Sequence, residues 1–198
     1  MKQVVVIHGG TTFSDYDNYL QSLTTKTLHT ERFIYKPMWK ELLQEKLGDA
    51  YQVLLPAMPN KTNARYEEWA LWFRHLTDII EDDVILIGHS LGAIFLAKYL
   101  SDNEFPHIIK ATILVAAPYD DDTDEDLGDF RIESINHQLS NQAGRLVFFA
   151  GNDDPVISNS EILKYQTMLP DAEFHIVSAP DHFVRQDFPE LTNLLKQL

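Results

Sequence analysis

The sequence lacks cysteine and is poor in basic residues. None of its 198 residues is cysteine, which excludes disulfides, thiolate zinc sites and a cysteine nucleophile. Lysine and arginine number 16 against 30 aspartate and glutamate residues, so the formal net charge is −14 at pH 7. A surface with so little positive charge is poorly suited to phosphate backbones or anionic bilayers. We therefore expect neither a nucleic-acid partner nor a membrane partner.

Long hydrophobic runs are also missing. The first apolar run covers only residues 4–7, far shorter than a signal-peptide core or a membrane span. A cytoplasmic protein is the resulting expectation. The hydrophobic fraction of 44% supports a sizeable core, and the length is close to that of one domain of about 150 residues. We predict a single domain over residues 1–198.

Short aliphatic runs alternate along the chain with longer segments of helical periodicity. The runs are apolar throughout rather than alternating, as in parallel strands that helices cover on both faces. The six predicted strands span residues 4–7, 51–55, 84–87, 108–116, 146–150 and 174–177. This alternation predicts an α/β fold, a three-layer sandwich with about six parallel strands.

Helix signals accompany the strand signals. Spacings of three, four, seven and eleven residues predict one buried helical stripe, made of Trp69, Trp72, Phe73, Leu76 and Ile80. Ser158 with Glu161, and Asp187 with Glu190, have the spacing of capping boxes at helix starts.

A G-x-S-x-G motif occupies residues 88–92, between the third predicted strand and an apolar helix. Such a turn strains the serine backbone and exposes its hydroxyl, while the flanking glycines remove side chains that would collide. The first N–H groups of the helix then point at the group that the serine attacks. We predict Ser90 as the nucleophile and the Leu91 N–H as an oxyanion donor. A glycine-rich turn with an incidental serine is the alternative, which the flanking buried strand and helix disfavour.

A serine nucleophile needs a base, and the base needs an acid. Asp153 and Asp154 follow the fifth predicted strand, and His182 follows the sixth. The order Ser, Asp, His is that of α/β-hydrolases. Adjacent side chains cannot both face the imidazole; we favour Asp154 and keep Asp153 as the alternative. Either can also belong to an Asx turn before Pro155.

The loop after the first strand, residues 8–11, supplies two glycines that let backbone amides approach an oxyanion. We choose Gly10 as the second oxyanion donor, with Thr11 behind it. His8 is expected to hydrogen-bond the loop, and His89 to pack behind the serine. The histidines lack the spacing of metal ligands, so we expect no metal and no cofactor.

Seven of the ten residues 120–129 are acidic. Four positions match a calcium loop, at Asp122, Asp124, Asp126 and Glu133, but the glycine falls at Gly128, one place late. A solvated loop is favoured, and the calcium question stays open. Because this stretch follows the fourth strand, we expect residues 118–133 to form a lid-like loop over the site.

Together these motifs make the chain resemble the α/β-hydrolase superfamily, and within it the small cap-less serine hydrolases of the YdeN and retinoblastoma-binding protein nine type. The narrower resemblance is carried by chain size, by residues 88–92, by Met58-Pro59, by Asp153-Asp154-Pro155 and by His182-Phe183. It implies a minimal α/β-hydrolase fold without a cap domain, hydrolysis of small esters or of peptides, and Asp154 as the triad acid.

The chain departs from the family pattern at two places. Asp181 stands where the family has glycine, so a second carboxylate is expected near the imidazole as a competitor or backup for Asp154. Residues 24–39 form a long connection with Phe33, Tyr35 and Trp39, which we expect either to roof the site or to pack on the sheet edge.

We therefore predict a serine hydrolase of the carboxylesterase type, cleaving a small carboxylic ester, thioester or amide through an acyl-enzyme. The alternatives are a non-catalytic binding protein on a hydrolase scaffold and a cofactor-free lyase. The net charge favours neutral or cationic esters, and the short lid favours modest chain lengths. The sequence leaves open whether the chain is a monomer or a homodimer.

Overall fold

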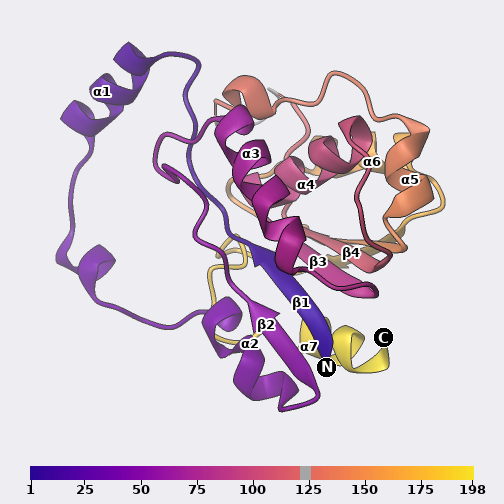
Figure 1. The fold of residues 1–198 in the computed structure, drawn as a ribbon. Coiled ribbons are helices and arrows are strands. Elements are labelled where there is room, and N and C mark those ends of the chain that lie inside the picture. Colours follow the sequence, from indigo (N-terminus) through magenta and orange to yellow (C-terminus); the bar gives the residue numbers. More distant parts are fainter. Residues whose placement is uncertain (121–125) are drawn as a thin grey trace.

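A single parallel sheet organises the molecule, as the computed structural model of residues 1–120 and 126–198 shows (Figure 1). The strand order is β2-β1-β3-β4-β5-β6. The strands are β1 (Lys2–Ile7), β2 (Tyr51–Leu54), β3 (Val84–His89), β4 (Ile109–Val115), β5 (Arg145–Gly151) and β6 (Glu173–Val177). All pairings are parallel, and each strand overlaps a predicted one. The predicted parallel sheet is confirmed.

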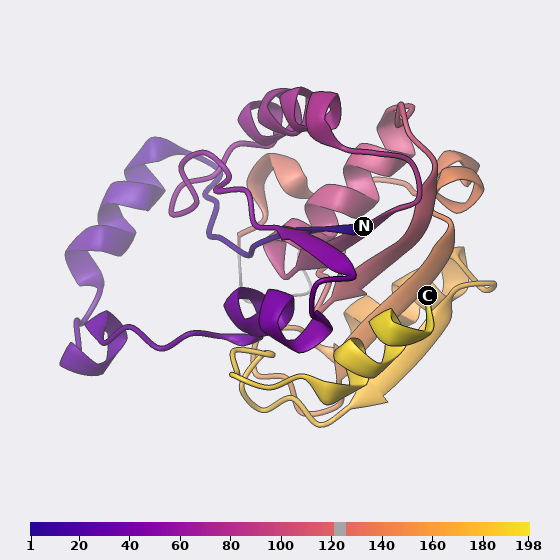
Figure 2. The same cartoon turned by 60° about the horizontal axis from the view of Figure 1, so that its bottom comes forward.

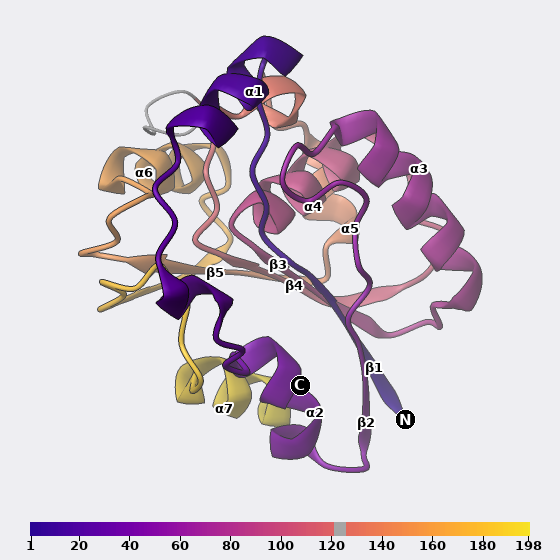
Figure 3. The same cartoon turned by 90° about the vertical axis from the view of Figure 1, so that its left-hand side faces the viewer.

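Helices cover both faces of the sheet, as the edge-on view in Figure 3 shows: α3 to α6 lie on one face and α2 with α7 on the other. Their bounds are α1 (Tyr16–Thr25), α2 (Trp39–Leu47), α3 (Tyr66–Leu76), α4 (Leu91–Asp102), α5 (His137–Gln142), α6 (Asn159–Met168) and α7 (Pro189–Gln197). Three 3₁₀ turns are η1 (Thr30–Phe33), η2 (Thr77–Ile79) and η3 (Gly128–Phe130). None of the described helices has the length and apolarity needed to cross a membrane.

The continuous apolar runs are explained by the two cores. In β1, Val5 and Ile7 pack into the core under α3 and α4, whereas Val4 and Val6 pack into the core under α2 and α7. Alternate residues of a strand point to opposite faces, so a strand covered on both sides needs apolar residues at every position. Because the strands are parallel, the loops that follow β1, β3, β5 and β6 meet at one edge of the sheet.

The predicted helical stripe is only partly correct. Trp69 and Phe73 are fully buried against Phe95 of α4, but Trp72 is 45% exposed. One residue rotates a helix by about 100°, which turns Trp72 away from the α4 side that Phe73 faces. Ile80 is buried, but it lies beyond the end of α3.

Both predicted capping boxes are wrong. The Glu161 carboxylate is fully buried and accepts the N–H groups of Tyr119 and Asp120 at 2.5 and 3.0 Å, in the loop after β4. Asp187 forms an ion pair with Lys46 instead of capping α7. The Glu161 carboxylate is therefore engaged by two backbone amides, which would be costly to leave unpaired, and not by the start of α6.

The connection between β1 and α2 leaves the body of the protein. Figures 1 and 2 show α1 and η1 standing away from the sheet, and α1 buries no residue. Phe33 and Tyr35 are 70% and 80% exposed, so they neither roof the site nor pack on the sheet edge, contrary to prediction. Trp39 is the exception, because it is buried in the core beside α7.

Candidate active site

Ser90 lies in a strained turn between β3 and α4. Its φ of 54° and ψ of −120° fall outside the regions that L-residues favour. The surrounding glycines make the turn possible: a Cβ at Gly88 would collide with the Gly92 carbonyl oxygen, and one at Gly92 would collide with the Ile7 carbonyl oxygen. The motif predicted at residues 88–92 thus has the strand-turn-helix geometry of a nucleophile elbow.

One hollow of about 170 Å³ brings most of the predicted site residues together. Gly10, Ser90, Leu91 and His182 all line it, although they come from three different loops. Its other walls are Thr11, Thr12, Pro118, Asp126, Leu127, Val156 and Ile157. The volume accommodates a small group, and the exposed serine turn forms part of its surface.

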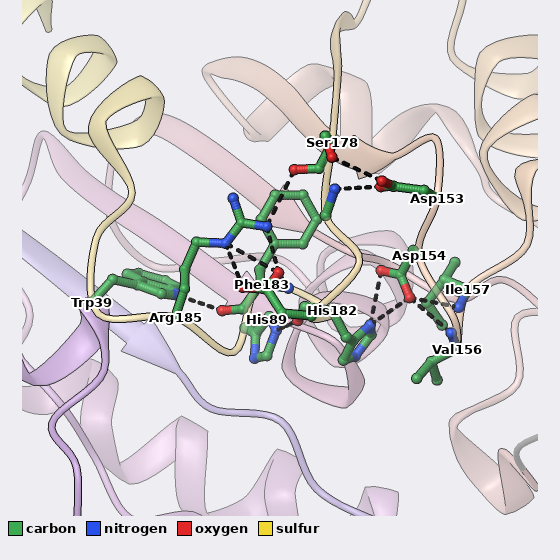
Figure 4. Close-up of polar contacts among 12 residues, drawn as sticks. Trp39, His89, Asp153, Asp154, Val156, Ile157, Ser178, His182, Phe183 and Arg185 are labelled. Carbon is green, nitrogen blue, oxygen red and sulfur yellow. Dashed lines mark hydrogen bonds and ion pairs between the residues drawn. The ribbon is translucent and has the colours of Figure 1, made fainter.

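His182 and Asp154 are in direct contact. The Nδ1 atom of His182 lies 2.9 Å from Oδ2 and 3.0 Å from Oδ1 of Asp154 (Figure 4). The His182 side chain is 13% exposed and the Asp154 side chain only 1%. Since the carboxylate accepts the Nδ1 proton, the unprotonated Nε2 lies on the opposite edge of the ring. No Ser90–His182 hydrogen bond occurs among the described contacts, which is common before substrate binds.

The backbone turn after β5 separates the two adjacent aspartates. Asp154 Oδ1 accepts the N–H groups of Val156 and Ile157 at 2.8 and 3.1 Å, which fixes the carboxylate toward His182. Asp153 points the other way and accepts the Ser178 hydroxyl at 2.8 Å and the Ala179 N–H at 2.5 Å (Figure 4). These hydrogen bonds, led by that of Ala179, lower the pKa of Asp153. Of these two aspartates, Asp154 is the one that contacts the imidazole.

The backbone amides of the loop after β1 differ in whether they already have an acceptor. The Thr11 N–H donates to the Lys61 carbonyl at 2.8 Å, so it is already engaged. The N–H groups of Gly10 and Leu91 have no acceptor among the described residues. A Cβ at Gly10 would lie 2.6 Å from the Lys61 oxygen, so only glycine fits there.

His8 connects the loop after β1 to the loop after β2 through its two ring nitrogens. Its Nδ1 lies 2.7 Å from the Gly9 carbonyl oxygen, and its Nε2 accepts the Met58 N–H at 2.9 Å. Burial lowers its pKa. A neutral imidazole with both nitrogens occupied holds the loop and has no free position to serve as a base.

His89 links α2 to the loop that carries His182. Its Nε2 donates to the His182 carbonyl at 2.9 Å, and its Nδ1 lies 3.3 Å from Lys40 Nζ. His89 is 4% exposed, and burial holds its pKa well below the ordinary value. Next to it, Trp39 Nε1 donates to the Phe183 carbonyl at 3.0 Å (Figure 4).

These contacts matter because His182 and Phe183 both have positive φ, 54° and 55°. Two donors from side chains behind the loop therefore hold two consecutive carbonyls of strained residues. The sequence did not point to Lys40, and it placed Trp39 in the connection over residues 24–39 without indicating its hydrogen bond to the His182 loop, because no motif marks either residue.

Two further acidic residues near the site, Asp181 and Asp126, have partners of their own. The Asp181 carboxylate accepts from Arg185 Nε at 2.9 Å, and Arg185 lowers its pKa. Asp126 accepts the N–H groups of Ser14 and Gly128. Of the calcium positions considered above, Asp122 and Asp124 lie outside the described residues. Within the described residues, no group of three or more histidines or carboxylates is arranged to hold a metal ion.

Comparison with known proteins gives a match to one protein family. Residues 36–195 match the family described as serine hydrolase. No curated protein matches the sequence.

Solved structures with the same fold are numerous. The YdeN gene product of B. subtilis aligns with a TM-score of 0.76 at 21% identity, covering 100% of this chain and 98% of that one. A putative YdeN-like hydrolase from Pectobacterium atrosepticum gives 0.60 at 18% identity, covering 98% and 90%. Naproxen esterase from Bacillus subtilis gives 0.60 at 12%, covering 99% and 82%. At these identities the likeness establishes the α/β-hydrolase fold and nothing finer.

Proposed function

The chain belongs to the serine hydrolase family, and we propose that it hydrolyses a small carboxylic ester through a Ser90–His182–Asp154 triad. The observation that carries the proposal is that one hollow is lined by the nucleophile, the base and both oxyanion donors: Ser90, His182, Gly10 and Leu91. Asp154 is hydrogen-bonded to Nδ1 of the His182 imidazole. Nucleophile, base, acid and two unpaired amides are the parts that acyl transfer requires.

In the proposed reaction, His182 Nε2 takes the Ser90 hydroxyl proton as Oγ attacks the ester carbonyl carbon. The Gly10 and Leu91 N–H groups hold the oxyanion of the tetrahedral intermediate. Asp154 keeps the proton on Nδ1 and stabilises the imidazolium. The C–O bond to the alcohol then breaks, the leaving oxygen takes the proton from Nε2, and an acyl-enzyme remains.

Water completes the cycle. It gives a proton to His182 Nε2 as its oxygen attacks the acyl carbon, and the second intermediate releases the acid and restores the Ser90 hydroxyl. Leu127, Val156 and Ile157 line the hollow. A small hollow with these apolar residues on part of its wall favours short acyl groups.

The test is labelling with a fluorophosphonate probe, followed by turnover of 4-nitrophenyl esters of increasing acyl length. We expect labelling of the wild type and of Asp153→Asn, and none of Ser90→Ala. Labelling that persists in Ser90→Ala would contradict the mechanism. Labelling at Ser90 without turnover of any ester would favour the binding-protein alternative, since a binder needs no deacylation.

A further inference from the structure

A second cleft, of about 690 Å³, adjoins the hollow at Ser90. The two share Gly10 and Thr11 as a common wall. The cleft lies between the loops that follow β1 and β2 and the start of α2, and three lysines line it: Lys26, Lys40 and Lys61.

Lys40 is the unusual member of this set, because its residue is only 8% exposed. Its Nζ lies 3.3 Å from His89 Nδ1, and it forms no ion pair with any described carboxylate. Glu41, the acid on the cleft wall, accepts the Met38 N–H in the first turn of α2. A buried ammonium without a counter-ion is costly, so buried charges are normally paired.

The electrostatics of the cleft agree with this geometry. Burial lowers the pKa of Lys40, and the positive charge of Lys61 adds to the lowering while Glu41 opposes it. The positive charges of Lys61 and Lys40 also contribute to the lowered pKa of His8, after burial. Lys61 and Lys40 therefore repel each other across this cleft, and Glu41 offsets that repulsion without forming an ion pair with either lysine.

Lys40 is the only buried lysine among the described residues. Lys46 pairs with Asp187, and Lys164 pairs with Asp120 and Glu161. Other lysines without an ion pair among the described residues, such as Lys2 and Lys110, are exposed to water, which solvates their charge. Neither Lys26 nor Lys61 has an ion pair within the part of the chain that the structure describes. The cleft beside Ser90 is thus a local reversal of the protein's charge.

We propose that this cleft is a subsite for an anionic oxygen group of the substrate, a carboxylate or a phosphate, which supplies the counter-ion that Lys40 lacks. The inference rests on the proposed function, and it names the substrate class as short esters with an anionic end. It also revises the expectation from net charge, because the field inside a cleft is set by the residues that line it.

A pair of esters of matched chain length tests the proposal. One is the mono-4-nitrophenyl ester of glutaric acid, whose far end is a carboxylate; the other is 4-nitrophenyl pentanoate, whose far end is a methyl group. We expect kcat/KM to favour the anionic ester by about tenfold or more, since a charge-assisted hydrogen bond contributes about 1.5–3 kcal/mol.

Lysine variants connect that preference to the cleft. Lys40→Met should remove most of the preference, and Lys61→Gln, which changes an exposed rim residue, should reduce it about threefold, as expected for a more exposed charge pair. Lys110→Gln, near the start of β4 and therefore at the opposite end of the sheet, is the control and should leave the preference unchanged. Equal kcat/KM values in the wild type, or a preference that both cleft variants retain, would overturn the subsite.

A binding measurement separates this proposal from the proposed function. Ser90→Ala is titrated calorimetrically with glutarate, with inorganic phosphate and with pentanamide as the neutral control. Binding of either anion that weakens when Lys61→Gln is added supports the subsite even if no ester is hydrolysed, and the stronger anion identifies the group. Absence of anion binding to Ser90→Ala would overturn the subsite and leave the triad proposal untouched.

Discussion

The two flanks of Ser90 differ in how their polar groups are satisfied. On the β5–β6 flank, Asp154 accepts from His182 and from two backbone amides, and Asp153 and Asp181 each have partners of their own. On the β1–β2 flank, Lys40 and Lys61 line a cleft without an ion pair to any described carboxylate.

This difference suggests that the two flanks have different roles in the proposed reaction. A group that transfers protons must already be held in place before substrate arrives, so its partners belong to the protein. A group that selects a substrate is useful only if the substrate supplies the missing partner. The β5–β6 flank, whose polar groups are paired, is therefore suited to proton transfer. The β1–β2 flank, whose lysines have no ion pair, is suited to recognising the substrate.

The largest expected effect comes from the paired flank. Asp154→Asn should lower kcat by about 10⁴-fold, because an amide no longer keeps the Nδ1 proton in place or stabilises the imidazolium. Asp153→Asn is the matched control: this neighbour points to Ser178 and Ala179, so kcat should change less than about threefold, as for an exposed pair. Steady-state kinetics on 4-nitrophenyl acetate measure both. If Asp153→Asn proves the inactive variant, the acid has been misassigned.

A smaller effect is expected at His89, which links the two flanks through Lys40 and His182. His89→Gln keeps an amide donor near the Nε2 position, whereas the shorter His89→Asn does not reach the His182 carbonyl. We expect kcat to fall about 10–100-fold in His89→Asn, for a lost hydrogen bond and an unpaired carbonyl of about 1–3 kcal/mol. Recovery of most of that activity in His89→Gln is the check, and equal activities would mean that the contact does not position His182.

The sequence predicted the sheet well, because parallel strands buried on both faces leave short continuous apolar runs, and these alternate with longer segments of helical periodicity. The nucleophile turn was equally readable, since residues 88–92 combine local backbone constraint with flanking apolar elements. Asp154 could be favoured but not separated from Asp153 from sequence, because the choice depends on which carboxylate the turn directs inward.

The errors share a physical cause. Glu161 has the spacing of a cap but is taken by the loop after β4, and Lys40 follows a connection whose course no periodicity reveals. Both act across long stretches of chain, where tertiary contacts override local patterns. The same holds for Trp72, which local spacing places in the core and the position of α4 leaves exposed.

Acidification tests whether the buried imidazoles stabilise the fold. Burial lowers the pKa of His89 and of His8 below their unfolded value of about 6.5. Below that pH the unfolded chain binds more protons than the folded one, so the free energy of unfolding should fall from about pH 7 to about pH 5. Urea titrations at the two pH values should show a smaller fall in His89→Gln. An equal fall in that variant would assign the effect to other groups.

The smallest effect expected is at Trp39, and it separates positioning from packing on the paired flank. Trp39→Phe keeps an aromatic ring against Phe188 but removes the N–H that the Phe183 carbonyl accepts. The lost hydrogen bond, the unpaired carbonyl and the smaller ring at a buried position should lower the free energy of unfolding by about 1–3 kcal/mol. Trp72→Phe, at a 45% exposed indole, makes the same chemical change without that contact and should be close to neutral. Because His89 still holds the His182 carbonyl, kcat in Trp39→Phe should stay within about threefold of wild type, a change of under 1 kcal/mol in the barrier. A larger loss of kcat would mean that Trp39 and His89 act together to position the loop that carries His182. Residues of α2 would then serve the catalytic step as well as line the cleft.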